Sequence, residues 1–246
     1  MSTVKQEWKK VKIELVVMGD LPYRLDLEKI KRWKSLLFEI TKTSTCKPPE
    51  HAKGEDEWEY SDAQLNEPLH DPDEVDIVLA VTSVPVEKKY TMRRFADNRA
   101  CMTYSEKVEM MIANNIPLEN FLLRGLYYLS LVYLRSGGKI PHSKEDKRYT
   151  HDETKGCIFD MCGIRPEVLY SLHKPRICRE CLEKIQQELH GFPANRIQLE
   201  LNEIKKDLIY QVTDFVKRYP VLSLFLSSCY AVFLGVVASM IASFIL

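Results

Sequence analysis

Four cysteines form the clearest chemical pattern in the chain. Cys157-Ile-Phe-Asp-Met-Cys162 is followed by fifteen residues and then by Cys178-Arg-Glu-Cys181. Two close cysteine pairs can supply the four thiolates of a tetrahedral zinc site, with Zn–S bonds of about 2.3 Å. We therefore predict that all four cysteines bind a structural Zn²⁺. Two alternatives stay open: four cysteines buried as small apolar side chains, or two disulfides, which need an oxidising compartment.

Two histidines that precede the cysteines offer a second kind of chemistry. His142 and His151 are nine residues apart, and Asp152 and Glu153 follow the second histidine directly. Histidine beside carboxylates can bind a catalytic metal or transfer protons. These residues therefore predict, as an alternative, a zinc-dependent hydrolase. The other interpretations are a surface loop, or a histidine that supports the cysteine zinc from outside its ligand shell.

Basic and aromatic residues alternate in the middle of the chain. The basic side chains are Lys88, Lys89, Arg93, Arg94 and Arg99, with Tyr90 and Phe95 among them. Basic and aromatic side chains arranged in this way can bind phosphates or nucleic acid. An ordinary basic face that neutralises an acidic loop is the preferred interpretation. Lys plus Arg and Asp plus Glu both number 35, so no net charge favours a nucleic-acid partner.

Length and composition allow a sizeable folded domain. The 246 residues are 45% hydrophobic, which is enough to bury a core. Seven cysteines, an odd number that includes Cys46, Cys101 and Cys229, do not resemble a disulfide scaffold. The first ten residues contain no apolar run, so we expect no secretory signal.

The elements that must position these residues begin with a strand and a helix. Apolar and charged residues alternate at the start of the segment from Val11 to Met18, and its end is fully apolar. This pattern predicts a strand that enters a core. Apolar residues at helical spacing predict a helix over Leu25 to Thr41. Thr43 to Glu74, with four prolines and an acidic run, predicts a long surface loop with one short strand at Glu57–Tyr60.

The second part of the domain contains the most apolar elements. Val75 to Val86 is β-branched and apolar, which predicts a strand covered on both faces. Ala100 to Tyr104 fits an edge strand. Glu119 to Arg135 is apolar almost all round and predicts the central buried helix. Strands and helices in this order predict an α+β fold.

The strand, the central helix and the cysteine framework together resemble the archaemetzincins, over roughly residues 10 to 190. The resemblance implies a zincin-like mixed sheet with a central buried helix and a Cys₄ zinc site, the four cysteines matching the family's structural ligands. It departs from the family in a slightly shorter middle loop and in the absence of the methionine that follows the second cysteine.

A larger departure concerns catalysis. The family's His-Glu-x-x-His-x-x-Gly-x-x-His motif places zinc ligands and a carboxylate base on one helix. Glu119 to Arg135 contains no histidine, and the residue before Cys157 is Gly156. The resemblance therefore implies a zincin-like scaffold that is not a peptidase.

The C-terminal part predicts a membrane anchor. Leu182 to Leu189 predicts a short helix, and Asn195 to Tyr219 a long amphipathic helix, either a short coiled coil or a helix packed on the domain. Val221 to Leu246 has 26 residues without a charge, enough to span a bilayer core of about 30 Å. Lys217 and Arg218 precede it, so the positive-inside rule places the N-terminal domain in the cytoplasm.

Small residues recur every four positions in the membrane segment. They are Ser227, Ala231, Gly235, Ser239 and Ser243. Such a stripe lets helix backbones approach closely, which predicts a homo-oligomer, with chance spacing as the alternative. The predicted organisation is a zinc-stapled cytoplasmic domain over 1–193, a linker helix over 194–219 and an anchor over 220–246. We expect the domain to act as a sensor, effector or interaction module with a protein or small-ligand partner.

Overall fold

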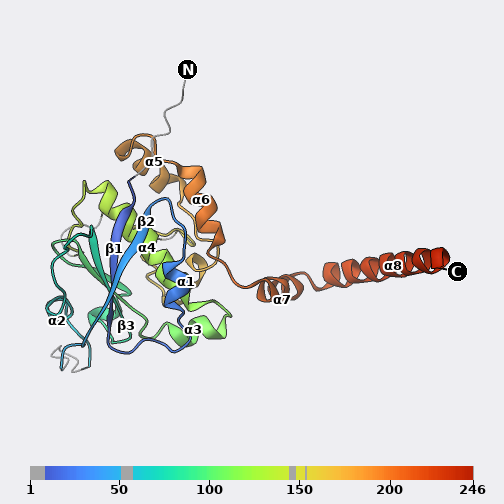
Figure 1. Cartoon of the computed structure of the whole chain (residues 1–246), viewed down its shortest axis with the longest axis horizontal. Helices are drawn as coiled ribbons and strands as arrows, with labels where there is room; N and C mark the ends of the chain where they lie inside the picture. The colour runs from blue at the N-terminus through green and yellow to red at the C-terminus, as the bar shows by residue number, and fades with distance from the viewer. Residues whose placement is uncertain (1–8, 51–57, 144–147, 153, 246) are drawn as a thin grey trace, which may run out of the picture. The chain divides into compact units, whose positions relative to one another are not determined.

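The computed structural model describes residues 9–50, 58–143, 148–152 and 154–245. The described residues up to Lys205 form one compact unit, and those from Lys206 onward form a second. The first unit contains the sheet and the four cysteines of the predicted zinc site, and the second contains the apolar C-terminal helix, drawn in red in Figure 1. Each unit is described separately below.

A five-stranded mixed sheet forms the centre of the first unit. Its strand order is β2-β1-β3-β5-β4, and every pair is parallel except β4 with β5. The bounds are β1 Val11–Met18, β2 Phe38–Cys46, β3 Ile77–Thr82, β4 Met92–Arg94 and β5 Arg99–Thr103. Each residue of β3 is buried, as the apolar sequence predicted.

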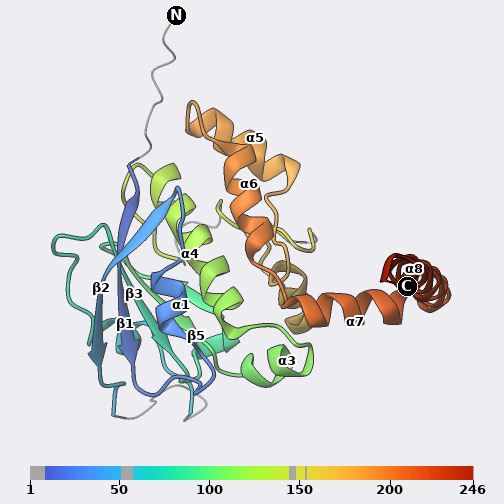
Figure 2. The same cartoon turned by 45° about the vertical axis from the view of Figure 1, so that its right-hand side comes forward.

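Helix α4, Leu118–Arg135, packs across one face of this sheet (Figure 2). Its side chains are buried almost all round, and Phe121, Leu122 and Tyr127 have no exposed surface. The ring of Tyr127 meets that of Phe38 edge-on, with centroids 5.1 Å apart. The predicted α+β class with a buried central helix is therefore confirmed.

The other face of the sheet is covered by a smaller core and the short helix α2, Asp62–Asn66. Ser61 and Gln64 form a capping box that fixes the start of α2. Part of the predicted surface loop is therefore buried: Asp62 and Glu59 are 8% and 7% exposed. Of the predicted short strand, Glu57 lies outside the described residues, and Tyr60 pairs with Val86 in an isolated bridge.

Glu14 of β1 is a buried carboxylate on this second face. Ser44 donates to it at 2.6 Å, His70 lies at 3.0 Å and the Lys42 ammonium at 3.2 Å. Burial by itself raises the pKa of Glu14, but the contacts with Ser44, His70 and Lys42 outweigh it and hold the pKa below its usual value. The carboxylate therefore stays charged inside the domain.

The predicted helix over Leu25 to Thr41 is wrong in its second half. Helix α1 covers only Leu27–Lys31, capped by the Asp26 side chain, and the chain then enters β2. The β-branched residues Ile40, Thr41 and Thr43 favour a strand, and pairing with β1 overrides the helical spacing. The predicted edge strand is also corrected, because β5 lies between β3 and β4, and β4 forms the edge.

The single helix predicted over Asn195 to Tyr219 is two helices. Helix α6, Ala194–Glu203, packs on the first unit and buries Ile197 and Leu201 completely. Its Glu200 carboxylate accepts hydrogen bonds from Ser35, the Leu36 amide and the Tyr127 hydroxyl. Figure 2 shows α4 between α6 and the sheet. The helix ends where Ile204 turns back into the core, so no continuous coiled-coil seam exists.

Four further elements complete the described part of the first unit. They are the helix α3, Val108–Ala113, the 3₁₀ segments η1, Glu87–Lys89, and η2, Arg165–Ser171, and the helix α5, Arg179–Glu188. The short helix predicted at Leu182 to Leu189 corresponds to α5, which starts three residues earlier.

The second unit consists of α7, Leu208–Arg218, and α8, Pro220–Ile245. By length and composition, one helix of the described chain could cross a membrane: residues Pro220–Ser243, with a mean hydropathy of 2.2. The hydroxyls of Ser227 and Ser243 donate to carbonyls of their own helix, which satisfies them without water. A Cβ built on Gly235 would meet nothing within 4 Å in this chain.

Candidate metal centre and adjoining pocket

Three cysteines and one histidine converge near the start of α5. One ligand atom from each of His151, Cys157, Cys178 and Cys181 lies within 4.8 Å of the others. The Nε2 atom of His151 is 3.4 Å from the Cys157 sulfur and 3.6 Å from the Cys178 sulfur. A tetrahedron with metal–ligand bonds of about 2.0–2.3 Å has edges of about 3.3–3.8 Å. Both distances from His151 fall in this range, so the group could hold a four-coordinate zinc ion.

Two short bridges and one helix start hold this group. His151 pairs with Asp160, and Cys157 pairs with Arg176, so both ligands lie on backbone that is hydrogen-bonded to a neighbouring segment. Cys178 is the N-cap of α5 and Cys181 lies in its first turn. A C-x-x-C pair at a helix start can direct both sulfurs to one side, because the chain turns sharply there.

Gly156 permits the turn before Cys157. Its φ of +87° belongs to the region that glycine adopts without strain, and a Cβ would lie 3.3 Å from the Tyr170 carbonyl oxygen. The amide of Arg176 donates to the Gly156 carbonyl at 2.9 Å. A side chain at this position would push the bridge apart and displace the Cys157 sulfur.

Cys162, predicted as the fourth ligand, lies outside this group. Its thiol donates to the Asp160 carbonyl at 3.5 Å, and an Arg124 nitrogen lies 4.0 Å from its sulfur. The intervening residues Ile158 and Phe159 are buried in the core, so they carry Cys162 away from Cys157. His151 takes the fourth place instead, a residue that the sequence offered only as a support of the zinc or as part of a hydrolase site.

The thiols influence each other in the way that metal ligands do. The Cys181 thiol hydrogen-bonds Cys157, and together with the Cys178 amide and His151 it lowers the pKa of Cys157 to about 5, although burial opposes this. The same contact with Cys157 raises the pKa of Cys181. Burial lowers the pKa of His151, but its hydrogen bond to Cys157 outweighs that and raises it. The three cysteine sulfurs and the imidazole are of the ligand types that Zn²⁺ prefers.

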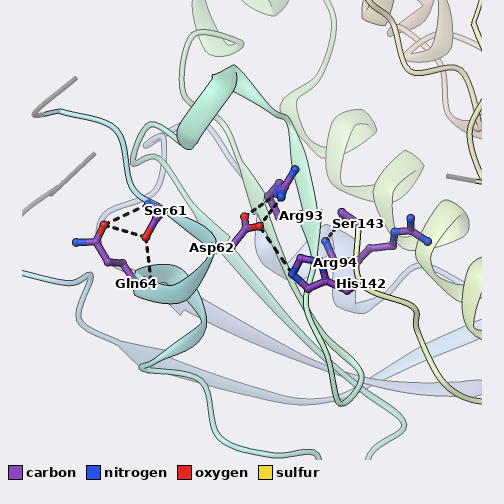
Figure 3. A network of polar contacts seen from close by, with 7 residues as sticks. All are labelled: Ser61, Asp62, Gln64, Arg93, Arg94, His142 and Ser143. Carbon is purple, nitrogen blue, oxygen red and sulfur yellow. Dashed lines mark hydrogen bonds and ion pairs between the residues drawn. The ribbon is translucent and has the colours of Figure 1, made fainter. Parts of the chain in front are cut away.

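The two candidate histidines do not form a joint site. His142 lies 3.8 Å from the Asp62 carboxylate, which forms a two-pronged ion pair with Arg93 (Figure 3). His151 belongs to the cysteine group. Glu153 lies outside the described residues, and Asp152 is exposed, with its carbonyl 3.3 Å from His151 Nδ1. The described residues therefore do not assemble the predicted hydrolase constellation.

A cavity of about 490 Å³ lies beside the metal group. It is bounded by η1 and β4, by one face of α4 and by the loop from Ile158 to Gly163. Phe121, Arg124 and Tyr128 face it from α4. The basic and aromatic character of residues 88–94 is visible in the sequence, but no pattern there indicates that α4 and the cysteine loop lie against them.

The α4 residues that line this cavity include no histidine and no carboxylate. Gly125 follows Arg124, and a Cβ there would lie 2.6 Å from the Met102 sulfur and 2.8 Å from the Met92 methyl group. The two methionines thus fill the space that a larger side chain would need. Arginine and tyrosine are the polar groups that this helix presents to the cavity.

The chain was compared with known proteins. No protein-family model matches it, and no curated protein sequence matches it. A solved structure that it resembles is archaemetzincin from Methanopyrus kandleri, at 19% identity and a TM-score of 0.44. The similar region covers 73% of this chain and 96% of that one. Archaemetzincin belongs to the family that the cysteine framework resembles.

Proposed function

We propose that this chain is a single-pass membrane protein whose zinc-stabilised domain binds a ligand or partner without hydrolysing it. The proposal rests on one observation: none of the four candidate metal ligands lines the cavity. The three thiols and the imidazole would fill all four positions of a zinc ion, which leaves none for a reactive water. The adjoining cavity contains binding groups and lacks metal ligands on α4.

The zinc would have a structural role. It would join the segment around His151 to the start of α5, two parts of the chain that are otherwise connected by short bridges. Closed four-coordinate sites of this type contribute folding free energy directly. In a reducing cytoplasm the three cysteines would remain thiolates available to the metal.

Helix α8 would anchor the domain in a membrane. Its length and lack of charge suit a bilayer core, and Lys217 and Arg218 precede it, which favours a cytoplasmic N-terminal domain. The small-residue stripe from Ser227 to Ser243 would bring two such helices together. A homo-oligomer is therefore part of the proposal.

Helix α7 would lie along the membrane surface. Leu208, Val212, Phe215 and Tyr219 recur at three- and four-residue spacing and are between 40% and 76% exposed. Their apolar face directly precedes α8 in the chain, so a bilayer is the nearest apolar phase that could cover it. Lys217 and Asp214 lie on the opposite side of the helix, where they would face water.

The test combines topology with metal content. The full chain should partition into the membrane fraction and carry one zinc per chain, and a chain ending at Asp207, which lacks both α7 and α8, should remain in the supernatant. An added protease should digest the N-terminal domain of cells opened at the plasma membrane but not in sealed cells. Membrane binding by the shortened chain, or a purified folded domain free of zinc, would contradict the proposal.

A zinc hydrolase is the second candidate function, and an activity assay tests it directly. Purified full-length protein would be incubated with peptide and protein substrates with and without zinc. We expect no zinc-dependent cleavage. Cleavage that His151→Ala abolishes while the fold persists would replace the binding proposal by the hydrolase.

A further inference from the structure

The cavity between β4, α4 and the cysteine loop is rich in positive charge. Among its described lining residues, six side chains are cationic and one is a carboxylate, Asp160. The cations are Lys88, Lys89, Arg93, Arg94, Lys107 and Arg124. Asp62, behind the cavity wall, pairs with Arg93. This imbalance favours an anionic occupant.

Arg124 and Asp160 are the two polar groups best placed to bind that occupant. An Nη nitrogen of Arg124 donates to the Asp160 carbonyl at 3.1 Å, which fixes the guanidinium at the cavity. The buried Nε of Arg124 has no hydrogen-bond partner among the described residues. Asp160 is 5% exposed, and its Oδ1 accepts from the Cys162 amide while its Oδ2 has no described partner.

Buried groups of this kind normally find partners, because leaving them unpaired is costly. Each of these two atoms has less than 1 Å² of accessible surface, so an occupant with an acceptor for Arg124 and a donor for Asp160 would pair with them after a small rotation of the two side chains. An anionic group supplies the first and a hydroxyl or amino group supplies the second. The two side chains therefore favour a molecule that is anionic at one end and carries a hydrogen-bond donor as well.

Aromatic rings form the remaining wall. Of the rings that line the cavity, Tyr90 and Tyr128 are 48% and 9% exposed and can contact an occupant, whereas Phe121 and Phe159 are buried at 0% and 1%. The guanidinium of Arg93 lies 4.5 Å from the centroid of the Tyr90 ring, and Tyr128 meets Phe159 edge-on. Rings and stacked guanidinium groups bind planar molecules across their faces. A volume of about 490 Å³ is in the range of pockets that hold small molecules.

We propose that this pocket binds a small phosphorylated molecule with a planar ring, of the mononucleotide class. The phosphate contacts Arg124 and the rim cations, a hydroxyl or amino group donates to Asp160, and the ring packs on Tyr90 and Tyr128. Lys88 and Lys89 are exposed at the rim, so they attract the phosphate without being needed for the fold. The inference deepens the proposed function, since it names the ligand of the non-catalytic cavity.

The experiment uses the zinc-loaded full chain in detergent and isothermal titration with AMP, adenosine, ribose 5-phosphate and inorganic phosphate. We expect AMP to bind more tightly than each of the three partial probes. Arg124→Gln should weaken AMP binding by about 10-fold or more, as expected for loss of a charge-assisted hydrogen bond. Arg196→Gln, at an arginine that lines a different cavity of the same domain, should leave it unchanged.

A second variant keeps the test valid if Arg124→Gln does not fold. Lys88→Gln with Lys89→Gln changes only exposed side chains, and it should weaken AMP binding and reduce its dependence on salt. No binding of AMP or of ribose 5-phosphate by the wild type would overturn the proposal. So would AMP affinity that is unchanged in both the folded Arg124 variant and the lysine variant.

Equal affinity for inorganic phosphate and AMP would also overturn it, because the site would then recognise an anion alone. Zinc content and membrane association are measured in the same preparations. If both persist while AMP does not bind, the ligand assignment fails and the proposed anchored zinc domain stands. If zinc is absent from the folded wild type, the proposed function itself fails.

Discussion

Replacing His151 by alanine should weaken the binding of zinc to the domain, whereas replacing Cys162 by serine should not. The sequence favours Cys162 as a ligand, and the structure groups His151 with the other three cysteines. A structural zinc contributes about 10–16 kcal/mol of apparent binding free energy in small zinc domains. If this binding free energy is divided equally among the four ligands, the imidazole contributes about 2.5–4 kcal/mol.

This loss is large beside the stability of a whole domain, which is about 5–15 kcal/mol. At about 2–4 °C per kcal/mol for a domain of this size, His151→Ala should lower the melting temperature by about 5–16 °C. The Cys162 thiol makes a weak hydrogen bond to the Asp160 carbonyl, and a serine hydroxyl can donate to the same atom. Cys162→Ser should therefore change stability by about 1 kcal/mol or less.

Three measurements test this prediction: the zinc content per chain, thermal unfolding with and without a chelator, and the absorption spectrum of the cobalt-substituted protein. The wild type should contain one zinc and melt lower when chelated. His142→Ala is the matched histidine control, because His142 lies beside Asp62 and not beside the cysteines. It should keep the zinc and the melting temperature.

Zinc retained by His151→Ala and lost by Cys162→Ser would refute the assignment. It would mean that the four cysteines bind the metal and that the loop from Ile158 to Met161 is placed differently. Two zinc ions in the wild type, one of them lost in His142→Ala, would show a second metal site near Asp62 and would favour the hydrolase.

The other predictions concern the core, the cavity wall and the C-terminal helices. The lowered pKa of Glu14 contributes stability that is complete above pH 4.5 and is lost as pH falls through its folded-state value. Glu14→Gln should therefore flatten the loss of stability in acid, which urea unfolding across that range would measure, and an unchanged acid profile would reject the idea. Gly125→Val should cost about 1–3 kcal/mol through overpacking against the two methionines, as seen in the unfolding midpoint, and a neutral result would show that they move aside. Gly235→Leu should shift the detergent-solubilised protein to a smaller assembly in light scattering, and an unchanged mass would exclude packing through the stripe. Replacing Leu208 and Val212 by serine should weaken protection of α7 from solvent labels in membranes without changing the assembly, whereas a change of assembly with unaltered labelling would indicate helix pairing instead.

Elements with a strong local pattern were predictable from the sequence. The strands β1 and β3, the buried helix α4 and the apolar helix α8 have hydrophobic patterns that few other structures could satisfy. Three of the four metal-group residues could be found in the same way, because the spacing of C-x-x-C and Cys157 limits where their sulfurs can reach.

Predictions from the local sequence pattern were wrong where contacts with distant residues decided the structure. Residues 36–41 have the spacing of a helix, but the edge of β1 offered a parallel partner and β2 formed instead. The amphipathic pattern from Asn195 to Tyr219 is continuous, yet the chain breaks after α6. The reason is that Ile204 is buried in the first unit, and its carbonyl accepts a hydrogen bond from the Lys174 amide at 2.6 Å instead of continuing the helix.

The fourth member of the metal group and the cavity were decided by tertiary structure alone. Cys162 is nearer in sequence to Cys157 than any other cysteine, but burial of Ile158 and Phe159 turns it toward Arg124. His151 reaches the group through a backbone bridge to Asp160, which no spacing rule encodes. The cavity arises because β4, α4 and the cysteine loop, three segments distant in the sequence, meet at one edge of the sheet.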